Sequence, residues 1–291
     1  MKQIRYIGKT TAAKLLNSRT GTFLLVFLAM AWRYDRPYLT LLQEQNQPIT
    51  WCIFPFFMAS VRFVALYFAG IVYANSDVPF MQHSNMYQVI RTGRRRWALG
   101  QISGIFLRSL ALSACSALLS ALPFFGRLEP TNRWGRVAYT MASEGEASAA
   151  FLSETIAEFT FHYDALASFS PAELMALTLV MCTLIGTFLG LLMFLLSLYA
   201  GKAVAVGITL AYVLLVYLVQ NTRPELRRAV SYFIPPCWAE IALYCTLDFG
   251  YYRLPPMGYM FGFLLISIAV MSLLICLRVR HVEFNWENED A

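Results

Sequence analysis

Two arginines lie inside long apolar stretches, and their depth limits the chemistry that they can do. Arg62 lies within Trp51–Ala74 and Arg108 within Ala98–Phe125. The end of the first stretch (Ala74) and the start of the second (Ala98) are expected on the same side of the membrane. At about 1.5 Å per helical residue, each arginine lies about 17 Å from that side, near the middle of a bilayer. Such a charge must meet protein, backbone carbonyls or water. Either the pair lines a pathway and meets an anionic substrate group, or each arginine ties neighbouring helices together, which is the commoner role.

The long apolar stretches contain no Asp, Glu or His. Carriers driven by protons or sodium generally bind the coupling ion through such a residue at membrane depth, although a sodium site built of carbonyls is an alternative. A membrane-embedded hydrolase needs a general base or a metal cluster. The sequence therefore argues against an ion-driven carrier and against an enzyme, and we expect no metal or cofactor on this chain.

Two further patterns carry little chemistry. Gly8-Lys9-Thr10-Thr11 resembles the end of a phosphate-binding loop, but that motif needs a glycine where the chain has Gln3. Four of the six cysteines lie in or beside apolar stretches, where a thiol behaves as a small hydrophobe: Cys52, Cys115, Cys182 and Cys276. Cys237 and Cys245 share one segment, and whether they pair stays open.

The composition is that of a polytopic membrane protein. Of the 291 residues, 58% are hydrophobic and 14% charged, and the mean hydropathy is +0.54, whereas soluble domains carry about a quarter charged residues. We therefore predict an all-α fold with six transmembrane helices. The expected spans are 20–32, 51–74, 98–125, 174–200, 203–220 and 257–277.

The segments outside the spans complete this layout. Residues 1–19 form an expected amphipathic cytoplasmic helix, 126–171 an outer loop, 221–256 a re-entrant or interfacial helical segment, and 279–291 an acidic cytoplasmic tail. The four lysines (Lys2, Lys9, Lys14 and Lys202) fall on one side, which places both termini in the cytoplasm. Ala29-Met30-Ala31 resembles a signal-peptide cleavage site, but the long amphipathic segment before it favours a retained first span.

A basic stretch, Met86–Gln101, joins the second and third spans. If Ser84–Arg94 is helical, Met86, Ile90 and Gly93 share one side, and the arginines lie around the polar face. A surface helix held between two spans transmits force, because both of its ends move with the spans. The simpler interpretation is that the arginines set orientation and contact lipid headgroups. A nucleic-acid role is not expected, because no stacking aromatics are interleaved with these arginines.

Small residues recur at helix-packing spacing. Gly100 and Gly104 open the third span, and Gly186 and Gly190 lie in the fourth. Glycines four residues apart let helices approach closely, either within one subunit or across a dimer.

The order of these parts resembles the membrane subunit of a type-2 ABC transporter, the exporter-like permease family. The matching features are the amphipathic helix 1–19, six spans, the IRTGRRRWALGQ join, the minimal turn Ala200-Gly201-Lys202 and the broken segment Val230–Thr246. The first span is shorter and the outer loop 126–171 longer than in minimal members. The resemblance implies a coupling helix at Asn85–Arg95 that docks on a separate ATPase subunit. Its expected contact residues, with the arginine that follows, are Asn85, Met86, Tyr87, Val89, Ile90, Arg91, Arg94, Arg95 and Arg96.

The resemblance also implies the partners and the location. ATP and Mg²⁺ would bind the ATPase subunit, and a second permease subunit, identical or related, would complete the pathway. The chain would sit in a bacterial plasma membrane and export an amphiphilic peptide, lipid or drug. The alternative is a non-transporting membrane sensor or immunity protein that binds a ligand through its outer loop.

Overall fold

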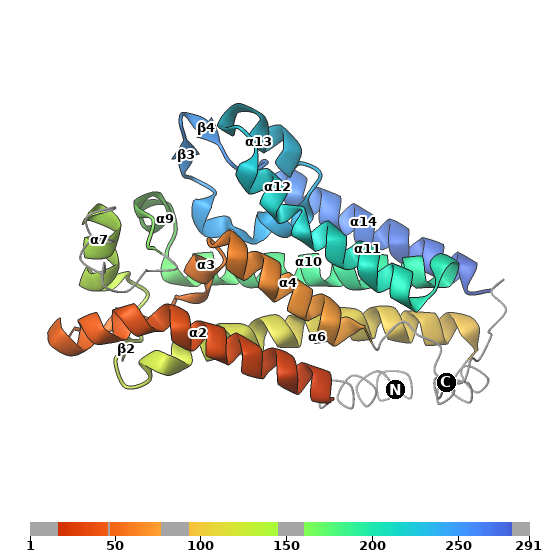
Figure 1. Ribbon diagram of the computed structural model, residues 1–291, viewed down its shortest axis with the longest axis horizontal. Coiled ribbons are helices and arrows are strands. Elements are labelled where there is room, and N and C mark those ends of the chain that lie inside the picture. Colours follow the sequence, from red (N-terminus) through yellow and green to blue (C-terminus); the bar gives the residue numbers. More distant parts are fainter. Residues whose placement is uncertain (1–16, 46, 77–92, 145–159, 281–291) are drawn as a thin grey trace.

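Long apolar helices form the body of the molecule in the computed structural model, which describes residues 17–45, 47–76, 93–144 and 160–280. Among these residues, four helical stretches are long and apolar enough to cross a membrane. They are α6 (Arg94–Ala121) with η1 (Leu122–Phe124), α10 (Pro171–Ala200), α11 (Lys202–Leu214) with α12 (Val216–Asn221), and α14 (Met257–Arg278). Helix α10 lies at the centre and packs against α6, α11 and α14 (Figure 1).

The third to sixth expected spans coincide closely with these helices. A capping box fixes the start of α10: Glu173 N–H donates to Ser170 Oγ, and the Glu173 carboxylate accepts from the backbone N–H of Ser170. Gly201 alone separates α10 from α11, and its φ of 79° lies in the left-handed region that favours glycine. The tight turn expected between the fourth and fifth spans is therefore present.

The first expected span is part of a much longer helix, α2 (Ser18–Gln45). The apolar face continues beyond Trp32 because buried residues recur at three- and four-residue spacing: Phe23, Phe27, Ala31, Tyr34, Tyr38 and Leu42. Arg33 and Arg36 are exposed. Pro37 does not break the helix, which runs through Ala29-Met30-Ala31 without interruption. Helix α2 therefore extends well beyond the expected first span, because its apolar face continues past Trp32 while Arg33 and Arg36 remain exposed.

The second expected span is not one continuous helix. It consists of α3 (Phe54–Phe57), a turn at Met58–Ser60, and α4 (Val61–Asn75). Pro55 starts α3, and Ser60 is extended, with φ −86° and ψ 118°. At about 1.5 Å per residue, α4 is about 22 Å long, which is shorter than a hydrocarbon layer of about 30 Å. Helix α4 packs against α2, α6, α10 and α11.

The expected outer loop and re-entrant segment contain short elements. Residues 126–171 include β2 (Leu128–Glu129), α7 (Gly135–Glu144) and α9 (Tyr163–Ser168), and β2 pairs in parallel with β1 (Ile49–Thr50). Residues 221–256 include α13 (Pro224–Ser231), η2 (Pro235–Ala239), η3 (Ile241–Leu243) and the antiparallel hairpin of β3 (Leu247–Asp248) and β4 (Tyr251–Tyr252). The hairpin and α13 project from the bundle at the top of Figure 1, whereas η2 and η3 are buried.

The glycines of the fourth expected span lie where α10 meets α6. A Cβ placed on Gly186 would lie 3.1 Å from Ser109 Oγ, and one on Gly190 would lie 2.5 Å from Ile105 Cγ2. Gly100 is buried and Gly104 half-buried on α6. The Gly186 and Gly190 contacts are within one chain, as expected for the packing of two close helices.

Candidate functional site: a cavity lined by arginines

The structure separates the two arginines that the sequence places at membrane depth. Arg108 is 2% exposed, and its Nη1 donates to the carbonyl of Ala74 at 2.8 Å. Ala74 is next to the last residue of α4, where carbonyls lack partners within the helix and the dipole favours a cation. Arg108 thus joins α6 to the end of α4, which is the helix-tying arrangement.

Arg62 lies elsewhere, on the first turn of α4, where it is exposed. The break between α3 and α4 therefore places it at a helix start, not in the middle of a 24-residue span. It lines a cavity of about 470 Å³ together with Arg253 and His162. Polar groups of Ser60, Gln220 and Asn221 also line this cavity. Segments far apart in the sequence thus meet around one polar space.

Arg253 is held in place by two contacts. Its Nε lies 2.9 Å from Glu240 Oε2, and its Nη2 donates to Gln220 Oε1. Glu240 is only 1% exposed. Burial raises the pKa of Glu240 to about 7, although the attraction of Arg253 opposes the shift. Glu240 is the buried counter-charge of Arg253.

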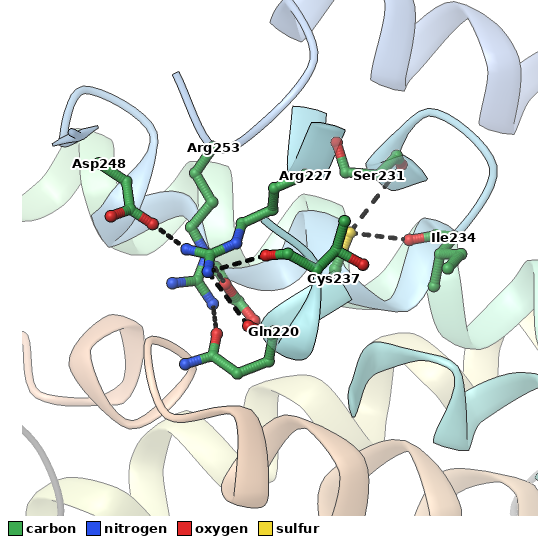
Figure 2. Close-up of polar contacts among 9 residues, drawn as sticks. Gln220, Arg227, Ser231, Ile234, Cys237, Asp248 and Arg253 are labelled. Atoms are coloured by element: carbon green, nitrogen blue, oxygen red, sulfur yellow. Dashed lines mark hydrogen bonds and ion pairs between the residues drawn. The ribbon is translucent and has the colours of Figure 1, made fainter. Parts of the chain in front are cut away.

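A second arginine, Arg227, holds together the segments that surround Arg253 (Figure 2). Arg227 forms an ion pair with Asp248 of the β3–β4 hairpin, and its Nη2 donates to the carbonyls of Gln220 at 3.1 Å and Thr222 at 3.3 Å. These carbonyls lie at the C-terminal end of α12, where a guanidinium satisfies groups that the helix leaves open. Arg227 thus fixes α12, α13 and the hairpin relative to one another.

His162 adds a polar but largely uncharged group to the cavity. Burial and the repulsion of Arg253 lower the pKa of His162, and Asp164 opposes this shift. Near neutral pH the imidazole is therefore mostly neutral and can donate or accept a hydrogen bond. The positive charge of the cavity comes from its two arginines.

The two cysteines of this segment are not paired. Cys237 is buried, and its thiol donates to the carbonyl of Ile234 at 3.0 Å (Figure 2), while Cys245 is a half-buried free thiol. Trp238 Nε1 donates to the carbonyl of Ser231 at 2.7 Å. Hydrogen bonds and packing hold this turn, and no disulfide does so.

The structure also buries two acids, which changes the inference drawn from the apolar stretches. Asp35 is fully buried on α2, and neither carboxylate oxygen has a hydrogen-bond partner among the described residues. Asp35 lies three residues beyond the expected end of the first span at Trp32, and Glu240 lies in the segment before the last span. The expected spans themselves contain no Asp, Glu or His, but these two buried acids lie just outside them, and they weaken the sequence argument against an ion-driven carrier.

The remaining expected site residues are only partly described. Residues 85–92 of the expected coupling helix, residues 1–16 and residues 281–291 lie outside the described part of the chain. Arg94, Arg95 and Arg96 form the first turn of α6. Arg94 Nη1 donates to the carbonyl of Arg280 at 2.9 Å, just beyond α14. All three arginines therefore belong to a long helix, and Arg94 contacts the residue just beyond the last one.

Comparisons with known proteins leave the site to be interpreted from its own geometry. No protein-family model, curated protein or solved structure matches the chain. Within the described ranges, no group of three or more His, Cys, Asp or Glu residues could hold a metal ion.

Proposed function

We propose that this chain is the permease subunit of an ATP-driven export complex in a bacterial plasma membrane. The arrangement of the bundle carries the proposal: α10 and α11 are joined by Gly201 alone, and a broken, partly buried segment separates α12 from α14. In this proposal, α2 and the broken segment of α3 and α4 complete six spans with the four long helices, and both termini lie in the cytoplasm.

The work of such a subunit is mechanical. A separate ATPase would bind ATP and Mg²⁺ and would dock on Asn85–Arg95, which follows α4 in the chain and ends in the first turn of α6. Because α4 packs against α2 and α11, a movement at that join would be transmitted to three helices of the bundle. A second permease subunit would complete the pathway for an amphiphilic peptide, lipid or drug.

The docking surface can be tested by co-purification in mild detergent. We expect Met86→Asp with Ile90→Asp, or Arg94, Arg95 and Arg96 changed to Gln, to reduce the amount of ATPase recovered with the chain. The matched control is Arg136→Gln on α7, an exposed arginine at the other end of the bundle from the α10–α11 turn (Figure 1). Unchanged recovery of the ATPase with the docking variants would count against the proposal.

One observation favours a second candidate function, an ion-driven carrier. Asp35 is a buried carboxyl whose oxygens have no hydrogen-bond partner among the described residues, and buried membrane acids often carry protons. In vesicles that contain this chain alone, that function predicts solute-linked proton uptake, which Asp35→Asn abolishes. An ATP-driven permease predicts no such uptake.

A further inference from the structure

The segment between α12 and α14 divides into a buried part and an exposed apolar part. Its middle, η2 and η3, is buried and packs against α10. On either side of this middle, α13 with the turn that follows it and the β3–β4 hairpin carry large apolar side chains that are exposed. These residues are Leu226, Phe233, Leu247, Phe249, Tyr251 and Tyr252. Exposed apolar residues that lie close together indicate a contact outside the chain.

The tip of the hairpin is aromatic although its backbone does not favour an aromatic residue. Phe249 and Gly250 connect β3 to β4, and both have positive φ, 50° and 85°. Turns of this kind favour Asn or Asp before Gly, because a bulky side chain is strained at positive φ. Phe249 is nevertheless 87% exposed. Neither the turn nor packing within the chain accounts for a phenylalanine here, so the observation points to an external contact.

The hairpin is held on a fixed support. A two-stranded hairpin is marginally stable alone, but Arg227 of α13 pairs with Asp248 of β3 and also donates to two carbonyls at the end of α12. Helix α13 packs against β4, and the guanidinium of Arg228 lies 5.9 Å from the centre of the Tyr252 ring. The exposed aromatic residues therefore keep a defined position relative to α12.

The position of α13 and the hairpin indicates which environment they contact. Residues 222–256 join the end of one helix that can cross a membrane to the start of another, so they lie at one membrane surface. Figure 1 shows α13 and the hairpin displaced to one side of α6 and α10, away from the α10–α11 turn. At a membrane surface, a part that projects sideways lies over the surrounding lipid. Leu214 and Leu218, on the preceding helices α11 and α12, are also exposed, so the apolar surface continues onto α13.

The residue types fit the boundary between lipid headgroups and acyl chains. Aromatic rings are enriched at this depth, and amphipathic segments lie there with their apolar side chains buried. The charges of residues 222–256 nearly cancel, because four arginines face three acids: Arg223, Arg227, Arg228 and Arg253 against Glu225, Glu240 and Asp248. Burial of apolar surface, and not attraction to anionic lipid, would therefore dominate the contact.

We propose that α13 and the β3–β4 hairpin form an interfacial anchor, with Phe249 and Tyr251 inserted into the lipid headgroup layer beside the bundle. The partner is the lipid surface itself, which is the outer leaflet in the proposed topology. The inference goes beyond the proposed transport function, because the anchor would contact lipid whether or not an ATPase drives the chain.

The test is electron paramagnetic resonance on the full-length chain in phosphatidylcholine vesicles. The native cysteines are replaced by serine, and a nitroxide label is attached to Phe249→Cys. Collisions of the label are measured with oxygen, which concentrates in the apolar layer, and with a polar nickel complex, which stays in water. Two exposed positions calibrate the ratio of the two collision rates: Ile266→Cys on α14, within a crossing helix, and Arg133→Cys, between β2 and α7.

We expect the ratio of oxygen to nickel collisions at Phe249→Cys to exceed that at Arg133→Cys by about threefold or more and to stay below that at Ile266→Cys, because the anchor lies at the boundary and not in the acyl core. A ratio equal to that at Arg133→Cys would place the tip in water and overturn the proposal. Low collision rates with both reagents would place the tip against a second copy or another protein, and would overturn it as well.

A second labelled position guards against misfolding of Phe249→Cys. Tyr251 lies on β4 beside the turn and is 49% exposed, and Tyr251→Cys leaves the residues of the turn unchanged. We expect its label to show the same intermediate ratio of collision rates. A ratio at Tyr251→Cys equal to that at Arg133→Cys, or low rates with both reagents, would contradict the anchor even if Phe249→Cys is not recovered as a folded protein.

Discussion

Glu240 lies next to a guanidinium and still has a raised pKa, because the loss of water around the buried carboxylate outweighs the attraction of Arg253. Its pKa is about 7 in the folded protein, against an ordinary value of 4.5. Between these values the folded state binds more protons than the unfolded state. The contribution of this group to stability is therefore fully present below about pH 4.5 and is lost as the pH rises through about 7.

Glu240→Gln should remove this dependence, since the amide does not titrate. We expect the melting temperature of the unchanged chain, minus that of the variant, to fall as the pH rises from about 5 to about 8, by an amount that corresponds to at most about 3 kcal/mol. The difference between the two proteins is the useful quantity because other groups titrate in both. A difference in melting temperature that stays constant from about pH 5 to about pH 8 would show that Glu240 does not titrate in this range.

Arg108 provides a second prediction at the scale of one residue. Arg108→Met keeps an unbranched, apolar stem but removes the guanidinium that donates to the buried carbonyl of Ala74. We expect a loss of about 2 kcal/mol of stability, measured as a lower melting temperature in detergent. Arg136→Met on α7, where the arginine is exposed, should change the stability little. An equal effect of the two substitutions would contradict a structural role for Arg108.

At the scale of helices, the close approach of α6 and α10 depends on Gly190. A Cβ there would lie 2.5 Å from Ile105 Cγ2, and Ile105 is fully buried. Gly190→Ala should therefore destabilise the chain by about 1–3 kcal/mol through overpacking. The control is Gly207→Ala on α11, where a Cβ would meet nothing within 4 Å. This substitution should leave the stability unchanged or raise it slightly. Equal melting temperatures for the two variants would argue against this packing.

How much of the fold the sequence predicts depends on the type of element. Helices α10 and α14 follow from uninterrupted apolar runs, and their ends are close to the expected residues. The break before Val61 and the extension of α2 past Trp32 depend on tertiary packing, which includes buried aromatic residues such as Phe57 and Tyr38. These contacts join distant segments, so local patterns do not reveal them.

The sequence predicts the cavity lined by Arg62 and Arg253 less well than it predicts the helices. The cavity joins residues near 60, 160, 220 and 250, and their proximity follows only from the fold. The cost of a charge in an apolar stretch marks Arg62, whereas nothing in the local sequence marks Arg253. Asp35 lies just outside the apolar stretch that defines the first expected span, so the composition of that stretch does not reveal this buried acid.

At the scale of the whole molecule, the proposed topology places the β3–β4 hairpin on the outside of the cell. A chain whose only cysteine is Cys245, a half-buried thiol just before the hairpin, should react with a membrane-impermeant maleimide added to intact cells. A chain that keeps only the buried Cys237 should react much more slowly. Labelling of Cys245 only after permeabilisation would reverse the topology.

The central claim is that a separate ATPase drives this chain from the cytoplasmic side. The most direct measurement is the ATP hydrolysis rate of the co-purified ATPase in vesicles, with the unchanged chain, with the Met86→Asp and Ile90→Asp chain, and with no chain. We predict that the unchanged chain raises the rate several-fold and that the substituted chain does not. Equal rates in all three preparations would contradict the account.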